Sequence, residues 1–361
     1  MNLGVFLPNW IGDVAMATPT LRALRSQFPA VRITGVMRPY VADVLAGTKF
    51  LDEQIFYDPH SRDSSLHGWP FLRRLRAERL DTVVLLTNSW RTGLLAWCSG
   101  ARRRVGYVRG GRGILLTDRL EHRRANGKYT PTPVLDDYLR LAYQLGCGLE
   151  SPRLELATLP ADEAAADVTW KRLALPAGRH VVALNSSGAF GSAKLWPSGH
   201  FAELARKIVC ATDNSVLVLC GPSEREIARD IVAAADHPRV VGLSDEQLSI
   251  GLTKACVRRC RLLVTTDSGP RYFGVAFGRD VVSLFGPTDP AHTRLTYDRE
   301  ATMSLRLECQ PCMKRTCPLG HHRCMRELTV DAVYGAVWGL LEGNVGVNAG
   351  NLLGSATGAL R

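Results

Sequence analysis

A short polar loop with the sequence TTDSGP, Thr265–Pro270, constrains the fold of this chain more than any other stretch. An apolar run typical of a buried strand precedes the loop, and a short helix is predicted after it. Asp267 or Ser268 can cap this helix, Pro270 suits its first turn, and Gly269 lets the backbone approach a ligand closely. A helix start offers free amides and a positive dipole end, so the loop is predicted to bind an anion, although so short a string also fits an ordinary strand-to-helix turn.

The same alternation of strand, loop and helix recurs along the whole chain. Strands are predicted at residues 3–7, 31–37, 82–86, 103–107, 180–184, 215–219, 239–243, 261–265 and 281–285. Helices are predicted at residues 71–79, 92–98, 134–145, 197–211, 224–234, 246–259 and 330–342, and from Asp13 to Gln27 with a kink or restart at Pro19, where Thr18 would be the cap. This rhythm indicates an α/β fold built on parallel, doubly wound sheets.

The length of 361 residues indicates two domains. We expect the first at residues 1–150 and the second at 160–328, joined by a linker within 146–159 that is rich in Gly, Pro and Ser. A last helix at 330–342 and a disordered tail at 343–361 follow. Two similar α/β halves imply a cleft between them, with ligands beyond the carboxyl ends of the strands.

Composition narrows the setting in which the protein works. The net charge of +11 suggests an anionic partner, and we find no motif of the kind that binds DNA or RNA. No segment approaches the roughly 20 apolar residues of a membrane span. The start has no basic region of a signal peptide, so we expect a cytoplasmic protein whose 10 cysteines are reduced thiols or metal ligands.

Several motifs fall at the predicted carboxyl ends of strands and occur in a specific order. They are PNWIGDVAMATPTLRALR, NSWRTG, RRRVGY, NSSGAFGSAKLWP, TTDSGP, FGPTDP and LECQPCMKRTCPLGHHRC. In this order and spacing, over roughly residues 1 to 340, the chain closely resembles the bacterial lipopolysaccharide heptosyltransferases of glycosyltransferase family 9, and the cysteine segment is most similar to one branch of that family.

The resemblance implies a glycosyltransferase B fold, with two Rossmann-like domains facing each other across a cleft. The first domain would bind the acceptor and the second the nucleotide sugar, with the last helix crossing back to the first domain. The implied reaction inverts the anomeric centre, takes ADP-heptose as donor and requires no metal or other cofactor. The implied acceptor is lipid A–Kdo–heptose at the inner face of the cytoplasmic membrane, to which the protein would be peripherally bound, with no nucleic acid as partner.

Two residues are expected to carry the chemistry. Inverting transfer needs a base for the acceptor hydroxyl, and Asp13 matches the family's proposed base; from the residues alone, Asp13 can equally be a helix N-cap. Departing ADP develops negative charge, which a lysine can stabilise. Lys194 matches the family lysine that contacts the donor phosphates, whereas a solvated surface lysine is the alternative.

The resemblance assigns donor binding to Ser186, Ser187, Glu224, Leu248, Asp267, Ser268, Gly269 and Tyr272. The serines, with the amides after Asp267, would hold the phosphates and the sugar, Glu224 the ribose and Leu248 the adenine. Glu224 can instead be an ordinary acid at a helix start, and Leu248 a core leucine. The family often has a histidine where this chain has Tyr272, which donates a hydrogen bond but carries no charge at neutral pH.

The acceptor side is predicted at four residues, Asn9, Asn88, Arg91 and Arg103. The arginines, with their neighbours in the run Arg102–Arg104, can meet the phosphates or carboxylates of the acceptor, although a solvated basic face explains each arginine singly.

The cysteine segment contains Cys309, Cys312, Cys317 and Cys324, with His321 and His322 between the last two. The spacing of the first pair suits zinc or an iron–sulfur cluster, and the second pair is unusually spaced. A packed loop with free thiols is the alternative that we favour, and in either case the segment has no expected catalytic role.

Three rival functions remain open from the sequence. The chain can be another family 9 transferase with a related donor or acceptor, or a sugar-nucleotide-binding protein that kept the fold without the activity, as the Tyr272 change allows. A metal-dependent nucleic-acid binder built on the cysteine segment is the third, and salt-sensitive binding to nucleic acid would favour it.

Overall fold

The computed structural model of the chain describes residues 1–125, 128–129, 132–177, 180–186 and 191–343. The chain divides into two compact units, Met1–Ala157 with Ala291–Leu295, and Thr158–Pro290 with Thr296–Arg361. The division falls within the stretch predicted as a linker. Apart from Gly343, the tail predicted as disordered lies outside the described residues.

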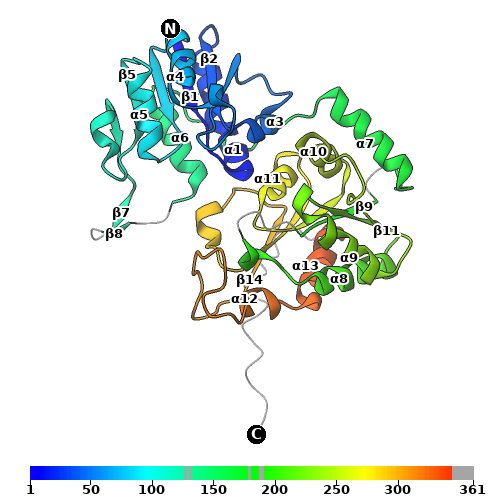
Figure 1. The fold of residues 1–361 in the computed structure, drawn as a ribbon. Coiled ribbons are helices and arrows are strands. Elements are labelled where there is room, and N and C mark those ends of the chain that lie inside the picture. Colours follow the sequence, from blue (N-terminus) through cyan, green and yellow to red (C-terminus); the bar gives the residue numbers. More distant parts are fainter. Residues whose placement is uncertain (126–127, 130–131, 178–179, 187–190, 344–361) are drawn as a thin grey trace. The chain divides into compact units, whose positions relative to one another are not determined.

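The first unit is built on a parallel six-stranded sheet in the order β3-β2-β1-β4-β5-β6 (Figure 1). Its strands are β1 Asn2–Phe6, β2 Arg32–Met37, β3 Glu53–Phe56, β4 Thr82–Leu85, β5 Arg103–Tyr107 and β6 Asp118–Leu120. Its helices are α1 Ile11–Met16, α2 Thr18–Gln27, α3 Ala42–Leu45, α4 Gly68–Ala77, α5 Trp90–Cys98 and α6 Val134–Gln144, with 3-10 turns η1 Pro39–Val41, η2 Ser64–Leu66 and η3 Arg112–Leu115. A short antiparallel hairpin joins β7 Arg124–Ala125 to β8 Lys128–Tyr129.

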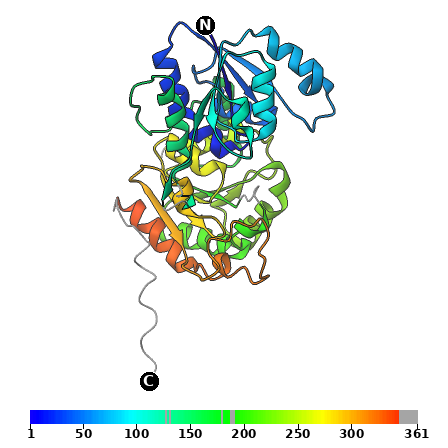
Figure 2. The same ribbon diagram turned by 90° about the vertical axis from the view of Figure 1, so that its left-hand side faces the viewer.

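Helices cover both faces of this sheet. Helices α1, α2 and α6 pack against one another, while α4 and α5 form a separate pair, as the turned view also shows (Figure 2). The central strands are therefore buried on both sides: every residue of β4 and all but the first of β1 are buried. This two-sided burial explains why these strands read as continuous apolar runs in the sequence.

The second unit repeats the design, with a parallel sheet in the order β11-β10-β9-β12-β13-β14. Its strands are β9 Val181–Asn185, β10 Ser215–Leu219, β11 Val240–Gly242, β12 Leu262–Thr266, β13 Asp280–Phe285 and β14 Glu300–Ser304. Its helices are α7 Pro160–Arg172, α8 Ser198–Ala211, α9 Arg225–Ala235, α10 Ile250–Arg259, α11 Gly269–Ala276, α12 Arg323–Arg326 and α13 Val330–Leu341, with 3-10 turns η4 Ser192–Lys194, η5 Pro222–Glu224 and η6 Pro290–Thr293.

The predicted restart at Pro19 is present, because α1 ends at Met16 and α2 begins at Thr18 with a proline in its first turn. Thr18 is the first helical residue rather than the cap: its hydroxyl donates to the Ala15 carbonyl at 2.8 Å and accepts from the Glu155 amide at 3.1 Å. The last helix, α13, packs against α8, β12 and β13 of its own unit, and its crossing to the first unit stays a prediction.

Candidate functional site

Each sheet has one point at which the strand order reverses, and the candidate residues gather there. In the first unit this point lies between β1 and β4, and in the second between β9 and β12. Loops that leave adjacent parallel strands in opposite directions open a crevice at the carboxyl edge of the sheet, where ligands of open α/β sheets bind.

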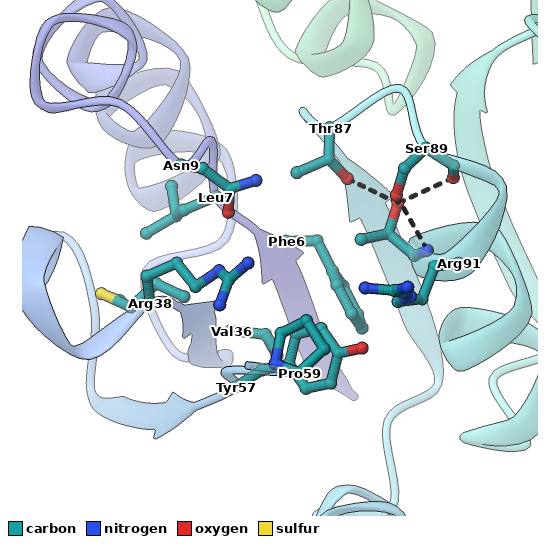
Figure 3. Close-up of a pocket in the computed structure, with 12 residues that line it drawn as sticks. Phe6, Leu7, Asn9, Val36, Arg38, Tyr57, Pro59, Thr87, Ser89 and Arg91 are labelled. Carbon is teal, nitrogen blue, oxygen red and sulfur yellow. Dashed lines mark hydrogen bonds between the residues drawn. The ribbon is translucent and has the colours of Figure 1, made fainter. Parts of the chain in front are cut away.

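The first unit has a cavity of about 290 Å³ at its reversal point (Figure 3). Its walls come from the carboxyl ends of β1, β2 and β4 and from the residues that follow β3. The lining residues are Phe6, Leu7, Asn9, Val36, Met37, Arg38, Tyr57, Pro59, Thr87, Ser89, Arg91 and Thr92. Asn9 and Arg91, both predicted from the sequence, thus share one cavity.

Two arginines give this cavity a positive character. Arg38 and Arg91 point their guanidinium groups into it from opposite sides (Figure 3). Burial raises the pKa of Tyr57, and the charges of Arg91 and Arg38 oppose that rise, so both act on the same hydroxyl. Arg38 also pairs with Asp58, whereas Arg91 is exposed. The arrangement suits an anionic or hydroxyl-rich ligand.

A buried arginine fixes the loop on the β4 side of the cavity. Arg112 is fully buried, and burial lowers its pKa to about 10. Its guanidinium donates to the carbonyl of Thr87 at 2.6 Å and to Oδ1 of Asn88 at 3.1 Å. Ser89 then caps α5, accepting from the amide of Thr92 at 3.1 Å. Asn88 is therefore held within the loop, and its side chain is one of the groups that shape it.

Like Asn88, two further predicted residues of the first unit lie outside the set that lines the cavity. Arg103 stands at the amino end of β5, where it donates to Oδ1 of Asp118 at 2.8 Å and to the Gln144 carbonyl at 2.9 Å. This placement gives no support to acceptor binding by Arg103. Asp13 lies in the first turn of α1 and is partly buried, while Trp10 occupies the N-cap position. The alternative that Asp13 is the N-cap is therefore wrong.

In the second unit, Lys194 and Asp267 form a buried pair. Nζ of Lys194 lies 2.6 Å from Oδ2 of Asp267 and 2.7 Å from its carbonyl oxygen. The two side chains are only 10% and 6% exposed, and the hydroxyl of Thr288 donates to the same carboxylate oxygen at 2.8 Å. Lys194 is thus not the solvated surface lysine that the sequence left open. The pair joins the loop after β9 to the loop after β12.

A second buried ion pair supports this site from within. Arg271 is fully buried, and its Nε and Nη2 donate to Glu300 at 2.5 and 3.0 Å. Burial is the largest single effect and disfavours its charge, but Glu300, together with Tyr272 and Asp267, outweighs that cost, so the pKa of Arg271 lies above its ordinary value. Its Nη1 also lies 4.0 Å from Asp267. Tyr272 is 3% exposed beside Arg271, a placement that favours packing over direct contact with a donor.

Asn185, the last residue of β9, links this strand to β12 and to the loop that follows β12. Its side-chain amide donates to the hydroxyls of Thr265 and Ser268, both at 2.9 Å. Ser268 holds the N-cap position of α11, yet no described side chain caps this helix, and Gly269 and Pro270 form its first turn. The helix start predicted to bind an anion is therefore present. The hydroxyl of the buried Ser186 has no hydrogen-bond partner among the described residues, and Ser187 lies outside them.

The other two predicted donor residues follow neighbouring strands. Glu224 ends η5 after β10, and its carboxylate accepts from the amide of Gly221 at 2.8 Å. Leu248 is partly exposed and follows β11, one residue before Ser249, which caps α10. Both lie on the carboxyl side of the sheet that carries Asp267, so the structure brings them to the same edge.

The loop that carries Lys194 is fastened to the cysteine segment. Gly191 has a φ of +151°, and a Cβ at this position would lie 2.4 Å from the carbonyl oxygen of Arg315. The amide of Ala193 donates to that same carbonyl at 3.0 Å. Only glycine fits so close an approach, so Gly191 and Arg315 together set the position of the lysine loop.

The four cysteines of the segment line one small cavity with Ala193, but within the described residues no three His, Cys, Asp or Glu side chains are gathered in a way that would hold a metal ion. All four thiols are free. Backbone hydrogen bonds, first from His322, lower the pKa of Cys317, whereas burial raises that of Cys324 to about 11.

Two units, each with a parallel sheet in the order 3-2-1-4-5-6, define the class of two-domain α/β proteins with the glycosyltransferase B fold. Structural comparison bears this out: the solved structure of E. coli ADP-heptose lps heptosyltransferase II matches with a TM-score of 0.76 at 22% identity, covering 95% of this chain and 99% of that one. The fold class predicted from the sequence is confirmed.

The chain belongs to glycosyltransferase family 9 (heptosyltransferase), whose family model matches residues 69–323. It is 32% identical over 337 residues to a lipooligosaccharide heptosyltransferase 2 of Campylobacter jejuni, covering 92% of this chain and 97% of that protein. It is 25% identical over 342 residues to the lipopolysaccharide heptosyltransferase 2 of Escherichia coli, covering 92% and 96%. The resemblance drawn from the motifs is confirmed.

The sequence did not single out several residues that the structure brings to these edges. They are Arg38, Tyr57 and Arg112 in the first unit and Asn185, Arg271 and Thr288 in the second, together with Glu300 at the amino end of β14, which pairs with Arg271. Arg38 directly follows β2, so the rule that ligands bind at carboxyl ends of strands would have found it. Glu300 starts an edge strand and gives no comparable signal.

Proposed function

We propose that this protein is an inverting glycosyltransferase that transfers a heptose from ADP-heptose to a heptose of the lipopolysaccharide inner core. The buried Lys194–Asp267 pair at the reversal point of the second sheet is the observation that carries the proposal. A cation fixed at the carboxyl edge of a doubly wound sheet, next to the start of α11, is suited to a diphosphate. The names of the most similar relatives support the choice of sugar.

The second unit would hold the donor. The diphosphate would lie against the first turn of α11 and Lys194, competing with Asp267 for the ammonium group. As the glycosidic bond to ADP breaks, Lys194 would stabilise the charge that develops on the leaving phosphate. Ser186, Ser187, Ser268 and Gly269 would hold the phosphates and sugar through hydroxyls and amides. Glu224 would bind the ribose and Leu248 would pack on the adenine.

The first unit would hold the acceptor in the cavity between Arg38 and Arg91, with Asn9 and the loop of Asn88 as neutral hydrogen-bonding groups. Asp13 would accept the proton of the attacking hydroxyl, so that the oxygen forms its bond to the anomeric carbon as ADP leaves. No step in this scheme assigns chemistry to the cysteine segment.

The acceptor proposed is lipid A–Kdo–heptose, which would place the reaction at the inner face of the cytoplasmic membrane. No helix in the described part of the chain is long and apolar enough to cross a bilayer. We therefore propose peripheral association with that face.

The test is a panel of nucleotide sugars and truncated core acceptors, with ADP release and the mass of the glycosylated acceptor measured together. We expect a mass gain of one heptose on the heptosylated acceptor with ADP-heptose. Release of ADP without sugar transfer, or transfer from a different nucleotide sugar, would contradict the proposed donor and acceptor. Donor binding without turnover on any acceptor would favour a non-catalytic sugar-nucleotide-binding protein.

A further inference from the structure

The outer side of α5 carries an apolar stripe that nothing in the described chain covers. Trp90, Leu94 and Trp97 follow the spacing i, i+4, i+7, so they share one face of the helix. Trp90 is 48% exposed and Trp97 is 55% exposed, while Thr92 and Ala96 on the opposite side are buried. Tryptophans are large and normally well buried in soluble domains, so two of them exposed on one helix face indicate a binding surface.

Helix α4 lies beside α5 and extends this surface with basic residues. Trp69, Arg73 and Arg76 share the outer face of α4, opposite the buried Phe71 and Leu75. Trp69 is 66% exposed, and the guanidinium of Arg76 lies 6.0 Å from the centre of its ring.

Arg76 also ties the two helices together, because its Nε donates to the carbonyl of Cys98 at the end of α5, at 2.8 Å. The two outer faces therefore form one continuous surface. We call Trp69, Arg73, Arg76, Trp90, Trp97 and Ile114 the aromatic–basic surface. Ile114 comes from η3, which packs against α5, and is 76% exposed.

Charge around this surface is predominantly positive. Arg74 and Arg79 stand beside Arg73 and Arg76 and are exposed, and within the described residues no carboxylate lies within 4 Å of these four guanidinium groups. Of the nearby acids, Glu78 is paired with Arg32 at 3.3 Å. The hydrogen bonds from Ser65 lower the pKa of Asp63, and the positive charge of Arg74 makes a smaller contribution in the same direction.

We propose that the aromatic–basic surface docks on an anionic phospholipid bilayer. Tryptophans concentrate at the level of the headgroups, where an apolar ring can stay close to water, and arginines near them are attracted by anionic lipid. A face that combines both residue types fits an anionic bilayer, because the arginines match the lipid charge and the tryptophan rings match the interface. A partner held by apolar contact alone would leave the arginines unmatched.

The aromatic–basic surface and the cavity of the first unit share helix α5, which indicates what docking would achieve. The first turn of α5 contributes Ser89, Arg91 and Thr92 to that cavity, and its outer face contributes the two tryptophans. A lipid-anchored acceptor would thus reach the cavity from the bilayer on which α5 rests. The docking deepens the peripheral association proposed above and rests on that part of the proposed function, whereas its test does not depend on catalysis.

The test measures binding to vesicles without donor or acceptor, so that its result is independent of catalysis. The protein is sedimented with vesicles of phosphatidylcholine alone and with vesicles containing about 30% phosphatidylglycerol. We expect binding to the anionic vesicles only, weakened when salt is raised from about 0.1 M to about 0.5 M. Trp97→Ala should lower the partition roughly tenfold, and Arg73→Gln about fivefold.

A matched control uses the same kinds of residue on α7 of the second unit. Val168 is 64% exposed and Lys171 is exposed, so Val168→Ala with Lys171→Gln removes an apolar and a basic side chain from an unrelated face. This control should bind like the parent. Absence of binding to anionic vesicles, equal binding of parent and Trp97→Ala, or retention of a nucleic acid in place of vesicles would each overturn the proposal. Turnover on a water-soluble acceptor should be unchanged in Trp97→Ala, which separates a docking defect from a failed active site.

Discussion

Replacement of Lys194 by methionine tests the core of the second unit's site. Methionine keeps most of the side-chain volume but removes the ammonium group that lies 2.6 Å from Asp267. Since the carboxylate is 6% exposed, the variant leaves a buried charge without its main partner. Breaking such a pair costs about 3 to 5 kcal/mol of unfolding free energy, and we expect the lower end because Thr288 and Arg271 still face the carboxylate.

Turnover should fall much more than stability alone would predict. If Lys194 stabilises the departing diphosphate, its removal lowers the rate by roughly 10²-fold or more at saturating donor. A double variant, Lys194→Met with Asp267→Asn, removes both charges. It should recover part of the lost stability, by up to about 3 kcal/mol relative to the sum of the single changes, without recovering turnover.

The assays are urea unfolding followed by fluorescence, and ADP release under single-turnover conditions. Lys207→Met is the matched control, because Lys207 pairs with Asp331 at the surface, where those side chains are 36% and 82% exposed. It should leave stability and turnover unchanged. A folded Lys194→Met variant with parental turnover would refute the assigned role, and one with parental stability would refute the burial argument.

Three further predictions address other parts of the structure. Asp13→Asn should lower transfer by roughly 10²- to 10⁴-fold while donor affinity measured by calorimetry stays the same; unchanged transfer would remove Asp13 from the mechanism. Gly191→Ala should destabilise the protein by roughly 2 to 4 kcal/mol in urea, because a Cβ would meet the Arg315 carbonyl, whereas Gly335→Ala on the exposed side of α13 should stabilise it by about 0.5 to 1 kcal/mol; equal effects would contradict the assigned constraint. Cys317 should be alkylated by iodoacetamide faster than Cys324 at neutral pH, because the lowered pKa of Cys317 makes a larger fraction of it thiolate; peptide mass mapping checks the order, and a reversed order would count against it. Exhaustive chelation should leave turnover intact in the ADP assay, and activity that is lost on chelation and restored by zinc would contradict this.

The sequence predicted the sheets well because their central strands are buried on both faces. Strands β1, β4, β9 and β12 each contain a run of apolar residues with polar residues only at an end, and each is bounded by loop residues. The edge strands β3, β6 and β14 were not predicted, because they are short or alternate between buried and exposed positions. Helix α7 was also missed, since its alanine-rich sequence has no clear apolar stripe.

Site residues could be predicted where they belong to a local sequence motif, but not where their role depends on a partner far away in the sequence. Lys194 and Asp267 were both identified, but their pairing joins residues 73 positions apart and came only from the structure. Arg271 and Glu300 were not identified at all, because one belongs to a helix and the other to an edge strand, and their pairing appears only in the folded chain. Arg103 shows a related limit, because a basic run in the sequence does not reveal that one of its members is held by Asp118; its role in acceptor binding stays a prediction.

The repeated strand order has a consequence for how such an enzyme changes over time. Each unit builds its own crevice from its own loops, so a substitution in the loops after β1 and β4 leaves those after β9 and β12 untouched. If the first unit binds the acceptor and the second the donor, mutations can change the specificity for one substrate without changing the specificity for the other. New combinations of the two can then arise by altering one half of the gene while the other stays fixed.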